Sequence, residues 1–356
     1  MIAYIKEPEY DGIDAVTARS KARVDAETIF DRRGYTPIDL KLPSKFSTSG
    51  IKRLKWHLDS QKSWKDTLNK LTDKDTLIIQ YPCTDFNLLL PSAIKSAKPK
   101  IVLLIHDWEK FRHIENKNEG IGRRIKCTVE EHLLKSADRI ITHNDIMKQK
   151  MIQHGIQSDK LISLGIFDYL IDDIDKNRLD QRNNGLDMPI IIAGNLTSKK
   201  SGYVYELPEE TKFNLFGAGY SAEEKTNIKY WGSFPPNDLP YHMEGSFGLV
   251  WDGTTSKTCD GATGNYLRIN NPHKTSLYLA SEIPVIIWSQ AALASYIKAN
   301  KCGITVDSLD DIRSELEKLN NSDYGEMRTN ASNLATKLRT GSSLNLALDE
   351  VERSLV

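Results

Sequence analysis

The sequence predicts an α/β protein made of two successive doubly wound domains, each with a largely parallel sheet. The first observation is the length, because 356 residues suffice for about two domains. The second is the alternation of short β-branched runs with helical stretches, which is typical of crossover units between parallel strands. The third is a polar stretch, residues 172–187, that separates two such series.

The first series is expected to form a Rossmann-like domain over residues 1–170. Each predicted strand is a short apolar run followed by polar or turn residues: Ile2–Ile5, 77–80, 101–105 and Arg139–Thr142. The predicted helices lie between them, at residues 18–33, 88–96 and 129–136. Gly34 follows the first helix, as expected of a C-terminal glycine.

The second series is expected to form a second Rossmann-like domain over residues 188–330, followed by a tail over 331–356. Its predicted strands are Ile190–Ala193, 212–215, 247–251, 284–288 and Gly303–Val306. Helices are expected at 275–281, 290–299 and 309–319, and one long helix at 330–355. In such sheets ligands bind outside the carboxyl ends of the strands, so we expect the site there.

The composition excludes several classes of protein. Lys and Arg number 48, as do Asp and Glu, which argues against a strongly basic nucleic-acid-binding protein. The apolar runs are far shorter than the roughly 20 residues of a membrane-spanning helix, and the N-terminus does not resemble a signal peptide. The four cysteines form no C-x-x-C pair, so we expect reduced thiols in a cytoplasmic protein, without structural zinc or disulfides.

One basic stretch, from Lys41 to Lys70, contains eight basic and two acidic residues with tryptophans between them. A basic amphipathic segment of this kind can lie on an anionic membrane surface. The alternative is a solvated helix face whose tryptophans pack onto the core. The sequence leaves both interpretations open.

The most informative segment runs from Asn271 through Pro272, His273, Lys274 and Thr275 to Ser276. Asn271 is expected to be the N-cap of a helix and Pro272 its first residue. Lys274 then places a positive charge where the helix dipole favours an anion. An anion such as a diphosphate, bound between the lysine and the helix N-terminus, would explain this conflict. An ordinary capped helix with a surface lysine is the alternative.

Two other strand ends are candidates for ligand contact. Gly194 and Asn195 directly follow a predicted strand, and Thr197 comes next, but the pattern is neither G-x-G-x-x-G nor a P-loop. A simple turn is the alternative. Trp251 and Asp252 end another strand, before residues 254–270, which show no clear periodicity. Loops of that length are uncommon unless they are functional, so this one is expected to cover the ligand or to be a plain insertion.

In the first half, His106 and Asp107 follow the strand predicted at 101–105, where a carboxylate is a plausible general base. Alternatively, Asp107 caps the next helix and His106 packs beneath it. Glu7 and Asp11, after the first strand, are reserve candidates. A D-x-D pattern, Asp173 to Asp175, lies in the polar stretch rather than at a strand end, so no metal is expected.

Several motifs together resemble those of the bacterial β-1,6-galactofuranosyltransferases. They are Ala193-Gly194-Asn195-Leu196, Phe216-Gly217, Gly232-Ser233-Phe234, Trp251-Asp252-Gly253, the Asn271-to-Ser276 run, Ile105-His106-Asp107 and Thr142-His143-Asn144. The resemblance covers most of the chain, and the Asn-Pro-His-Lys-Thr-Ser run is its most specific part. More distantly, the chain is similar to the glucosyltransferase 3-like enzymes of adhesin glycosylation.

The resemblance implies a GT-B fold, in which two Rossmann-like domains face a central cleft and the final helix crosses back to the first domain. It implies that the second domain binds a UDP-sugar donor and that the first presents the acceptor. Within such a fold, Asp107 is our choice for the catalytic base, with His106 orienting it or the acceptor. The donor-binding residues would be Gly194, Asn195, Thr197, Phe216, Gly217, Gly232, Ser233, Trp251, Asp252, Asn271, His273, Lys274, Thr275 and Ser276. No metal or other cofactor is expected.

The resulting hypothesis is an inverting transferase that moves galactofuranose from UDP-galactofuranose to a hydroxyl of a bacterial surface glycan such as O-antigen or capsule. The absence of a Glu-x7-Glu pattern around residues 260–274 is consistent with inversion. The acceptor is expected to be lipid-linked and the protein cytoplasmic, with a peripheral position on the inner face of the membrane as an alternative. The oligomeric state is open, a homo-oligomer included. Competing hypotheses are a UDP-glucose-dependent glucosyltransferase, a non-catalytic GT-B partner protein and a UDP-sugar epimerase.

Overall fold

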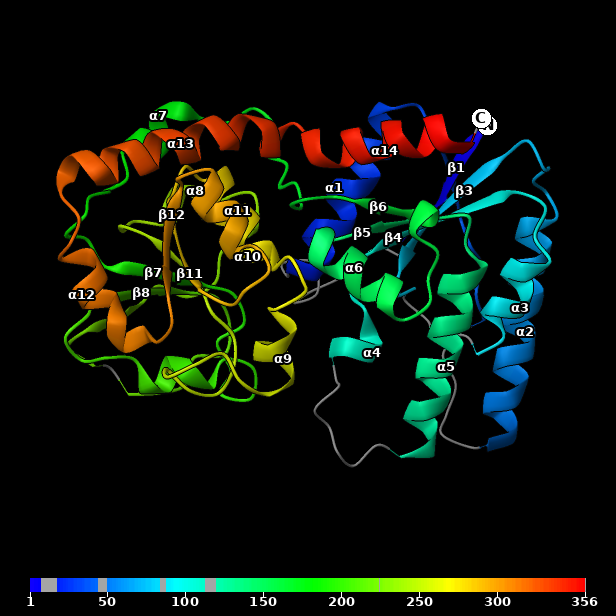
Figure 1. The fold of residues 1–356 in the computed structure, drawn as a ribbon, viewed down its shortest axis with the longest axis horizontal. Coiled ribbons are helices and arrows are strands. Elements are labelled where there is room, and N and C mark those ends of the chain that lie inside the picture. The colour runs from blue at the N-terminus through cyan, green and yellow to red at the C-terminus, as the bar shows by residue number, and fades with distance from the viewer. Residues whose placement is uncertain (8–17, 44–49, 84–87, 113–119, 224, 356) are drawn as a thin grey trace. The chain divides into compact units, whose positions relative to one another are not determined.

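The structure is a computed structural model that describes residues 1–7, 18–43, 50–83, 88–112, 120–223 and 225–355. The chain folds into two compact units, each built around one of the two sheets in Figure 1. The first unit comprises Met1–Glu9, Ala26–Leu164 and Asn345–Val356, and the second comprises Tyr10–Asp25 and Gly165–Leu344.

The first unit contains a six-stranded parallel sheet in the order β2-β1-β3-β4-β5-β6. Its strands are β1 (Ile2–Ile5), β2 (Thr36–Ile38), β3 (Thr76–Tyr81), β4 (Lys100–Ile105), β5 (Arg139–Thr142) and β6 (Leu161–Ser163). The four predicted strands are confirmed to within a residue. The two that were not predicted, β2 and β6, have three residues each and form the two edges of the sheet.

Helices alternate with these strands, as the pattern predicted. They are α1 (Ala18–Arg32), α2 (Gly50–Leu68), α3 (Leu90–Lys95), α4 (Glu109–Arg112), α5 (Ile121–Ser136), α6 (Asp145–Gln153) and the short 3-10 helix η2 (Ser158–Lys160). Within the basic stretch, Gly50–Leu68 form α2, in which Trp56 is 6% and Trp64 1% exposed. The tryptophans therefore pack onto the core, as the second interpretation of this stretch expected.

The second unit contains another six-stranded parallel sheet, in the order β12-β11-β10-β7-β8-β9. Its strands are β7 (Ile190–Ala193), β8 (Phe213–Phe216), β9 (Ile228–Tyr230), β10 (Gly248–Val250), β11 (Val285–Trp288) and β12 (Gly303–Val306). The side chains of β7, β8, β10 and β11 are all buried, as expected for a parallel sheet covered on both faces. Only β9, a short edge strand, was not predicted.

The helices of the second series are α7 (Lys176–Asp180), α8 (Leu239–His242), α9 (Gly261–Tyr266), α10 (His273–Ala280), α11 (Ala294–Ala299), α12 (Ile312–Leu316), α13 (Asn321–Arg339) and α14 (Ser342–Leu355), with 3-10 helices η3 (Gly202–Glu206) and η4 (Leu309–Asp311). Two predictions are wrong. Residues 254–270 contain α9, and the tail is two helices rather than one. The break falls at Gly341, whose φ of +81° ends a right-handed helix.

The longer segment of the second unit begins at Gly165, before the polar stretch 172–187 where the boundary is predicted. That stretch is part of the second unit, because Arg182 is buried and its guanidinium donates to the carbonyls of Leu179, Pro240 and Ser281. A segment rich in charged residues can thus contain one charged side chain that is buried and hydrogen-bonded, which its sequence does not reveal. No helix of the described residues is long and apolar enough to cross a membrane.

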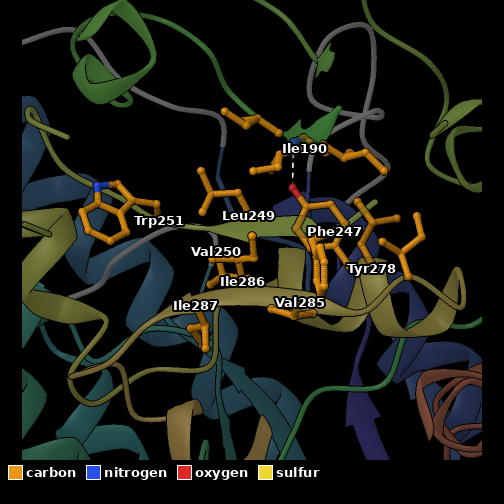
Figure 2. Close-up of a cluster of buried hydrophobic side chains, with 14 of the residues drawn as sticks. Ile190, Phe247, Leu249, Val250, Trp251, Tyr278, Val285, Ile286 and Ile287 are labelled. Carbon is orange, nitrogen blue, oxygen red and sulfur yellow. Dashed lines mark hydrogen bonds between the residues drawn. The ribbon is translucent and has the colours of Figure 1, made fainter. Parts of the chain in front are cut away.

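The core of the second unit fixes α10 against the sheet (Figure 2). Gly248 on β10 lies against the ring of Tyr278, since a Cβ there would come within 2.2 Å of the ring. The Tyr278 hydroxyl accepts a hydrogen bond of 2.7 Å from the N–H of Ala193, at the end of β7. The contact and the hydrogen bond set the position of Lys274, one helical turn before Tyr278.

Candidate functional site

At the carboxyl end of the second sheet, β7 and β10 are neighbours although they are far apart in sequence. From β7 the chain continues to β8 on one side, and from β10 to β11 on the other. Doubly wound sheets bind ligands at such a divergence point. Gly194 follows β7, and Trp251 and Asp252 follow β10, so the topology brings three predicted site residues to this point.

Three loops at this edge touch through the backbone of glycines. Gly194 N–H donates to the carbonyl of Phe216 at 2.9 Å, and Gly217 N–H donates to that of Gly232 at 2.8 Å. A Cβ on Gly217 would lie 1.8 Å from the Gly194 oxygen, and the φ of Gly217 is +139°. Only glycine fits this approach and this conformation. Ser233, directly after Gly232, is exposed.

Asn195 shapes the loop after β7. Its side-chain oxygen accepts from the N–H of Thr197 at 3.1 Å and from the Thr197 hydroxyl at 2.6 Å, which makes a local turn. The Ser201 hydroxyl donates to the Asn195 carbonyl, and Ser201 forms a β-bridge with Gly253, after β10. Gly194 and Asn195 are exposed. Their backbone is therefore accessible beside the loop that follows β10.

Lys274 carries the positive charge of this region. Its Nζ donates to the carbonyl of Trp251 at 2.8 Å and to Oδ1 of Asp252 at 2.9 Å. The ammonium and the carboxylate are 17% and 14% exposed. Burial works against the charge of Lys274, but the Asp252 carboxylate outweighs it and raises the lysine pKa. The lysine is thus charged and fixed at the end of β10.

Trp251 and Phe216 contact the other predicted site residues through their backbone carbonyls, not through their rings. The indole of Trp251, labelled in Figure 2, is fully buried. Its Nε1 donates to the carbonyl of Thr255 at 3.0 Å. The Phe216 ring is also fully buried and stacks with that of Trp231, with centroids 5.9 Å apart. For both residues, a contact between side chain and donor stays a prediction.

The start of α10 differs from the prediction. The helix begins at His273, and Pro272 is the N-cap, with an extended ψ of 126° and no side-chain hydrogen bond. The predicted N-cap, Asn271, instead donates from Nδ2 to the carbonyl of Gly165 at 3.0 Å. An N-cap asparagine would have to face the helix N–H groups, whereas this one joins α10 to the segment that enters the unit.

Two more predicted residues contact the same entering segment. His273 Nε2 lies 3.1 Å from the carbonyl of Asp168, and the Ser276 hydroxyl donates to that of Phe167 at 2.7 Å. Burial lowers the pKa of His273 to about 4, so its ring is neutral at pH 7. These side chains join α10 to the entering segment, and their contact with a donor stays a prediction.

Three buried polar atoms lie at or next to the start of α10 without a hydrogen-bond partner among the described residues. They are Oδ1 of Asn270, Nδ1 of His273 and Oγ1 of Thr275. Buried polar groups are nearly always hydrogen-bonded, and exceptions call for an explanation such as a ligand or water. Thr275 is fully buried in the first turn of the helix, next to Lys274.

Aromatic residues that sequence reasoning missed surround Gly217. The Tyr230 hydroxyl donates to the Gly217 carbonyl at 2.8 Å, and the Tyr220 ring lies 5.4 Å from that of Tyr230 and 5.5 Å from that of Tyr205. Tyr230 is 43% exposed. The available signal was an aromatic pair, Tyr230 and Trp231, directly before the predicted Gly232.

In the first unit, His106 and Asp107 follow β4, as predicted. His106 Nε2 lies 2.7 Å from Oε1 of Gln80 on the neighbouring β3. Asp107 accepts from Nη1 of Arg112 at 2.7 Å and is 26% exposed. Because α4 begins only at Glu109, Asp107 does not occupy its N-cap position. The carboxylate is therefore fixed by a side chain of α4 and accessible to solvent.

Glu130, on α5, fixes the other end of this loop and was not predicted. Its carboxylate accepts from the N–H groups of Glu109 at 3.0 Å and Lys110 at 2.8 Å, the first residues of α4. It also hydrogen-bonds the side chain of Tyr81 at the end of β3. Burial raises the pKa of Glu130 to about 7. In sequence this residue is indistinguishable from a surface charge, since Glu131 beside it is one.

The remaining candidates receive less support. Glu7 follows β1, and its N–H donates to the Glu27 carboxylate at 2.5 Å, while burial raises the pKa of Glu27 to about 7. Asp11 lies outside the described residues. Asp175, from the D-x-D pattern, is the N-cap of α7 and accepts from the N–H of Arg178. Among the described residues no group of His, Cys, Asp and Glu side chains is arranged to hold a metal ion.

Comparison with known families accounts for both units. Residues 4–166 match the N-terminal domain of the glucosyltransferase 3-like family, and residues 190–351 match its C-terminal domain. The chain is 36% identical to the β-1,6-galactofuranosyltransferase WbbI of Escherichia coli K12, over 79% of this chain and 80% of that protein. It is 23% identical to glucosyltransferase 3 of Streptococcus gordonii, over 71% and 72% of the two chains.

Solved structures with much lower identity share the fold. Sucrose-phosphate synthase of Thermosynechococcus elongatus has a TM-score of 0.61 at 11% identity, covering 99% of this chain and 98% of that one. WaaG, a glycosyltransferase of lipopolysaccharide biosynthesis, has 0.58 at 13% identity, over 96% and 98%. Anabaena HepE, in complex with UDP and glucose, has 0.56 at 10% identity, over 97% and 98%. With its two parallel six-stranded sheets and both domains matched, the chain belongs to the glucosyltransferase 3-like family and is a glycosyltransferase of the GT-B fold.

Proposed function

We propose that this protein transfers galactofuranose from UDP-galactofuranose to a hydroxyl group of a growing bacterial surface glycan, with inversion and without a metal ion. The sugar is supported by the 36% identity to the Escherichia coli β-1,6-galactofuranosyltransferase. The observation that carries the donor assignment is the Lys274 ammonium, which Trp251 and Asp252 fix at the end of β10. There the chain connections after the neighbouring strands β7 and β10 run to opposite sides of the sheet.

In this proposal the donor diphosphate lies beside Lys274 and the first turn of α10. That turn contains no acidic residue, and its free N–H groups and helix dipole favour an anion. The exposed backbone of Gly194 and Asn195 offers further contacts. As the sugar–phosphate bond breaks, negative charge grows on the leaving UDP, and fixed positive groups stabilise that transition state. Protein groups would then perform the task that a metal ion performs in other transferases.

The acceptor hydroxyl needs a base, because a sugar hydroxyl is a poor nucleophile at neutral pH. Asp107 takes this role in the proposal, since its carboxylate is partly exposed at the end of β4. Arg112 fixes the carboxylate, and His106, oriented by Gln80, lies beside it in the chain to orient the base or the acceptor. The proton of the acceptor would pass to Asp107 as the new glycosidic bond forms.

The acceptor in this proposal is a lipid-linked glycan, and the reaction takes place on the cytoplasmic side of the cell membrane.

The donor assay that tests the proposal needs no acceptor. The purified protein is incubated with UDP-galactose, with and without a mutase that supplies the furanose form, and UDP release is followed in the presence of a chelator. We expect release only when the mutase is present, because slow hydrolysis reveals a productive donor. Release that requires added metal would contradict the metal-independent step.

A glucosyltransferase that uses UDP-glucose is the second candidate. It is favoured by the match of both domains to the glucosyltransferase 3-like family. Release of UDP from UDP-glucose alone would replace the first proposal with this one. Product analysis with donor alone separates either transferase from an epimerase, because an epimerase returns a new UDP-sugar. UDP binding without turnover, even with acceptor glycans present, would indicate a non-catalytic partner protein.

A further inference from the structure

Helix α2 exposes a row of large apolar side chains to solvent. Ile51 is 87% exposed, Leu54 61% and Leu58 51%, although the helix buries Trp56 and Trp64 on its other side. Residues three and four apart lie on one face of a helix, so the three form a stripe. Single exposed apolar residues are normal, whereas an exposed contiguous group marks an interaction site.

Positive charges alternate with this stripe. Lys52, Arg53 and Lys55 are exposed, and no acidic residue occurs in α2 before Asp59. The first half of the helix therefore presents apolar and cationic side chains together. This differs from the sequence-based hypothesis of membrane contact, in which the tryptophans accompanied the charges, because the tryptophans are in the core.

Helix α5 begins in the same way. Ile121 is 78% and Ile125 45% exposed, and the spacing of four places them on one face. Arg124 and Lys126 are exposed beside them, and the first acidic residue is Glu130. This second stripe lies on a helix that the sequence analysis predicted only from residue 129 onward.

The two stripes lie at one end of the first unit. Helix α3 packs against both α2 and α5, and Figure 1 shows both helices beginning at the same end of this unit. We call Gly50–Leu58 and residues 121–126 together the basic tip. Its surface combines five exposed Ile and Leu side chains with five exposed Lys and Arg side chains, namely Ile51, Leu54, Leu58, Ile121 and Ile125 with Lys52, Arg53, Lys55, Arg124 and Lys126.

We propose that the basic tip binds the surface of an anionic lipid bilayer, with the cations among the headgroups and the isoleucine and leucine side chains inserted at the acyl boundary. Charge complementarity favours this occupant, because the residues of the basic tip, Gly50–Leu58 and 121–126, combine cationic and apolar side chains and include no acid, which matches an anionic membrane. Protein partners usually meet surfaces that are depleted in lysine at their centre, and this tip has the reverse composition. The inference concerns binding and holds whichever sugar is transferred; it relies on the proposed function only for a lipid-linked acceptor.

The test is co-sedimentation of the full-length protein with two kinds of vesicle, phosphatidylcholine alone and phosphatidylcholine mixed with phosphatidylglycerol. We expect binding to the mixed vesicles that weakens as salt screens the charges. The charge variant Lys52→Glu/Lys55→Glu should lose about tenfold or more in vesicle affinity. The apolar variant Ile51→Ser/Leu54→Ser/Ile121→Ser should lose binding even at low salt, since it removes the inserted groups.

The matched control is Ile146→Ser/Lys150→Ala on α6, which removes an exposed apolar residue and a cation elsewhere in the same unit. It should bind vesicles like the parent. UDP binding by every variant shows that each is folded, and it separates failure of this inference from failure of the donor assignment. Equal binding by the parent and both tip variants, or no binding to the mixed vesicles, would overturn the proposal. Self-association that is lost in the apolar variant, without vesicle binding, would assign the tip to a second copy of the chain instead.

Discussion

The end of β10 in the second unit and the end of β4 in the first have the same local design. Each carries an Asp that pairs with a cation on a helix further along the chain, Asp252 with Lys274 on α10 and Asp107 with Arg112 on α4. Their exposure differs, because the first pair is 14% and 17% exposed and the second 26% and 36%. In the proposed function the cation acts in the buried pair and the carboxylate in the open one. Which partner does the chemistry is therefore set by the surroundings rather than by the pair itself.

The two units also fix these loops by different means. In the second unit, Gly217 lets the backbone of two loops meet at a distance that no side chain would allow. In the first unit, one buried carboxylate, Glu130, collects the N–H groups that begin α4. The contact at Gly217 depends on steric fit, and the contacts of Glu130 depend on a titratable carboxylate. The two should therefore respond differently to mutation and to pH.

The largest effect is expected from Asp107→Asn. Loss of a general base typically slows transfer by about 10²- to 10⁴-fold, while UDP affinity should stay at the parent value because the proposed function assigns Asp107 to the acceptor and not to the donor diphosphate. Transfer to an acceptor glycan and UDP binding are measured together. The control is Glu109→Gln, which removes the other carboxylate that Arg112 contacts. A parental rate for Asp107→Asn would show that the open pair is structural.

Next in size is Lys274→Ala. Hydrogen bonds from charged groups contribute about 1.5–3 kcal/mol, so the dissociation constant for UDP should rise about 10- to 100-fold. Isothermal titration with UDP measures this directly. Lys318→Ala, which removes an exposed lysine that follows α12, should change nothing. Unchanged UDP affinity in Lys274→Ala would make Lys274 and Asp252 a purely structural pair.

Gly217→Ala tests the close approach of the backbone of Gly217 to that of Gly194. The new methyl group would meet the Gly194 oxygen in a conformation that alanine disfavours, so we expect a loss of about 1–3 kcal/mol in the free energy of unfolding. Gly232→Ala is the matched control, since its φ is also positive, at +82°, but nothing lies near the added Cβ. Urea unfolding of both variants isolates the cost of the contact. Equal losses would mean that conformation alone, and not the approach of the loops, requires glycine.

The smallest effect concerns pH and Glu130. Burial raises its pKa from 4.5 to about 7, so between these values the folded protein binds more protons than the unfolded chain. The free energy of unfolding must then fall as the pH rises through this window. Glu130→Gln should flatten that slope, whereas Glu131→Gln, whose side chain is exposed and has a lowered pKa, should not. Unfolding curves from pH 4.5 to 7 that are parallel for the parent and Glu130→Gln would contradict this.

The strands could be predicted where both faces are buried, because a continuous apolar run such as residues 101–105 is typical of a central strand in a parallel sheet. The edge strands β2, β6 and β9 are not predicted, because none of these three-residue strands is fully buried and none forms a continuous apolar run. The tail is predicted as one helix because only Gly341 interrupts its helical pattern. Local sequence alone therefore resolved the centres of the sheets better than their edges.

The site was predicted in part for a related reason. A glycine at a strand end predicts Gly194, and a positive charge in the first turn of a helix, against the preference of the dipole, predicts Lys274. The pairing of Lys274 with Asp252 needed the order of the strands, which the sequence does not reveal. The role of Glu130 follows only from its burial in the folded protein. The role of Asn271 follows only from the position of the segment that starts at Gly165. Each missed role depends on a contact between distant parts of the chain.

The path of the chain has a mechanical consequence. Both ends belong to the first unit, where β1 is an interior strand and α14 is joined to Arg33 through Asp349 and Glu352. A force applied between the two ends therefore acts first on the sheet of the first unit and on α14. The second unit is inserted in the chain between segments of the first, so it does not bear this force directly. Stretched between two beads, the molecule should first lose the contacts of α14 with Arg33, and the second unit should extend only after those contacts have broken.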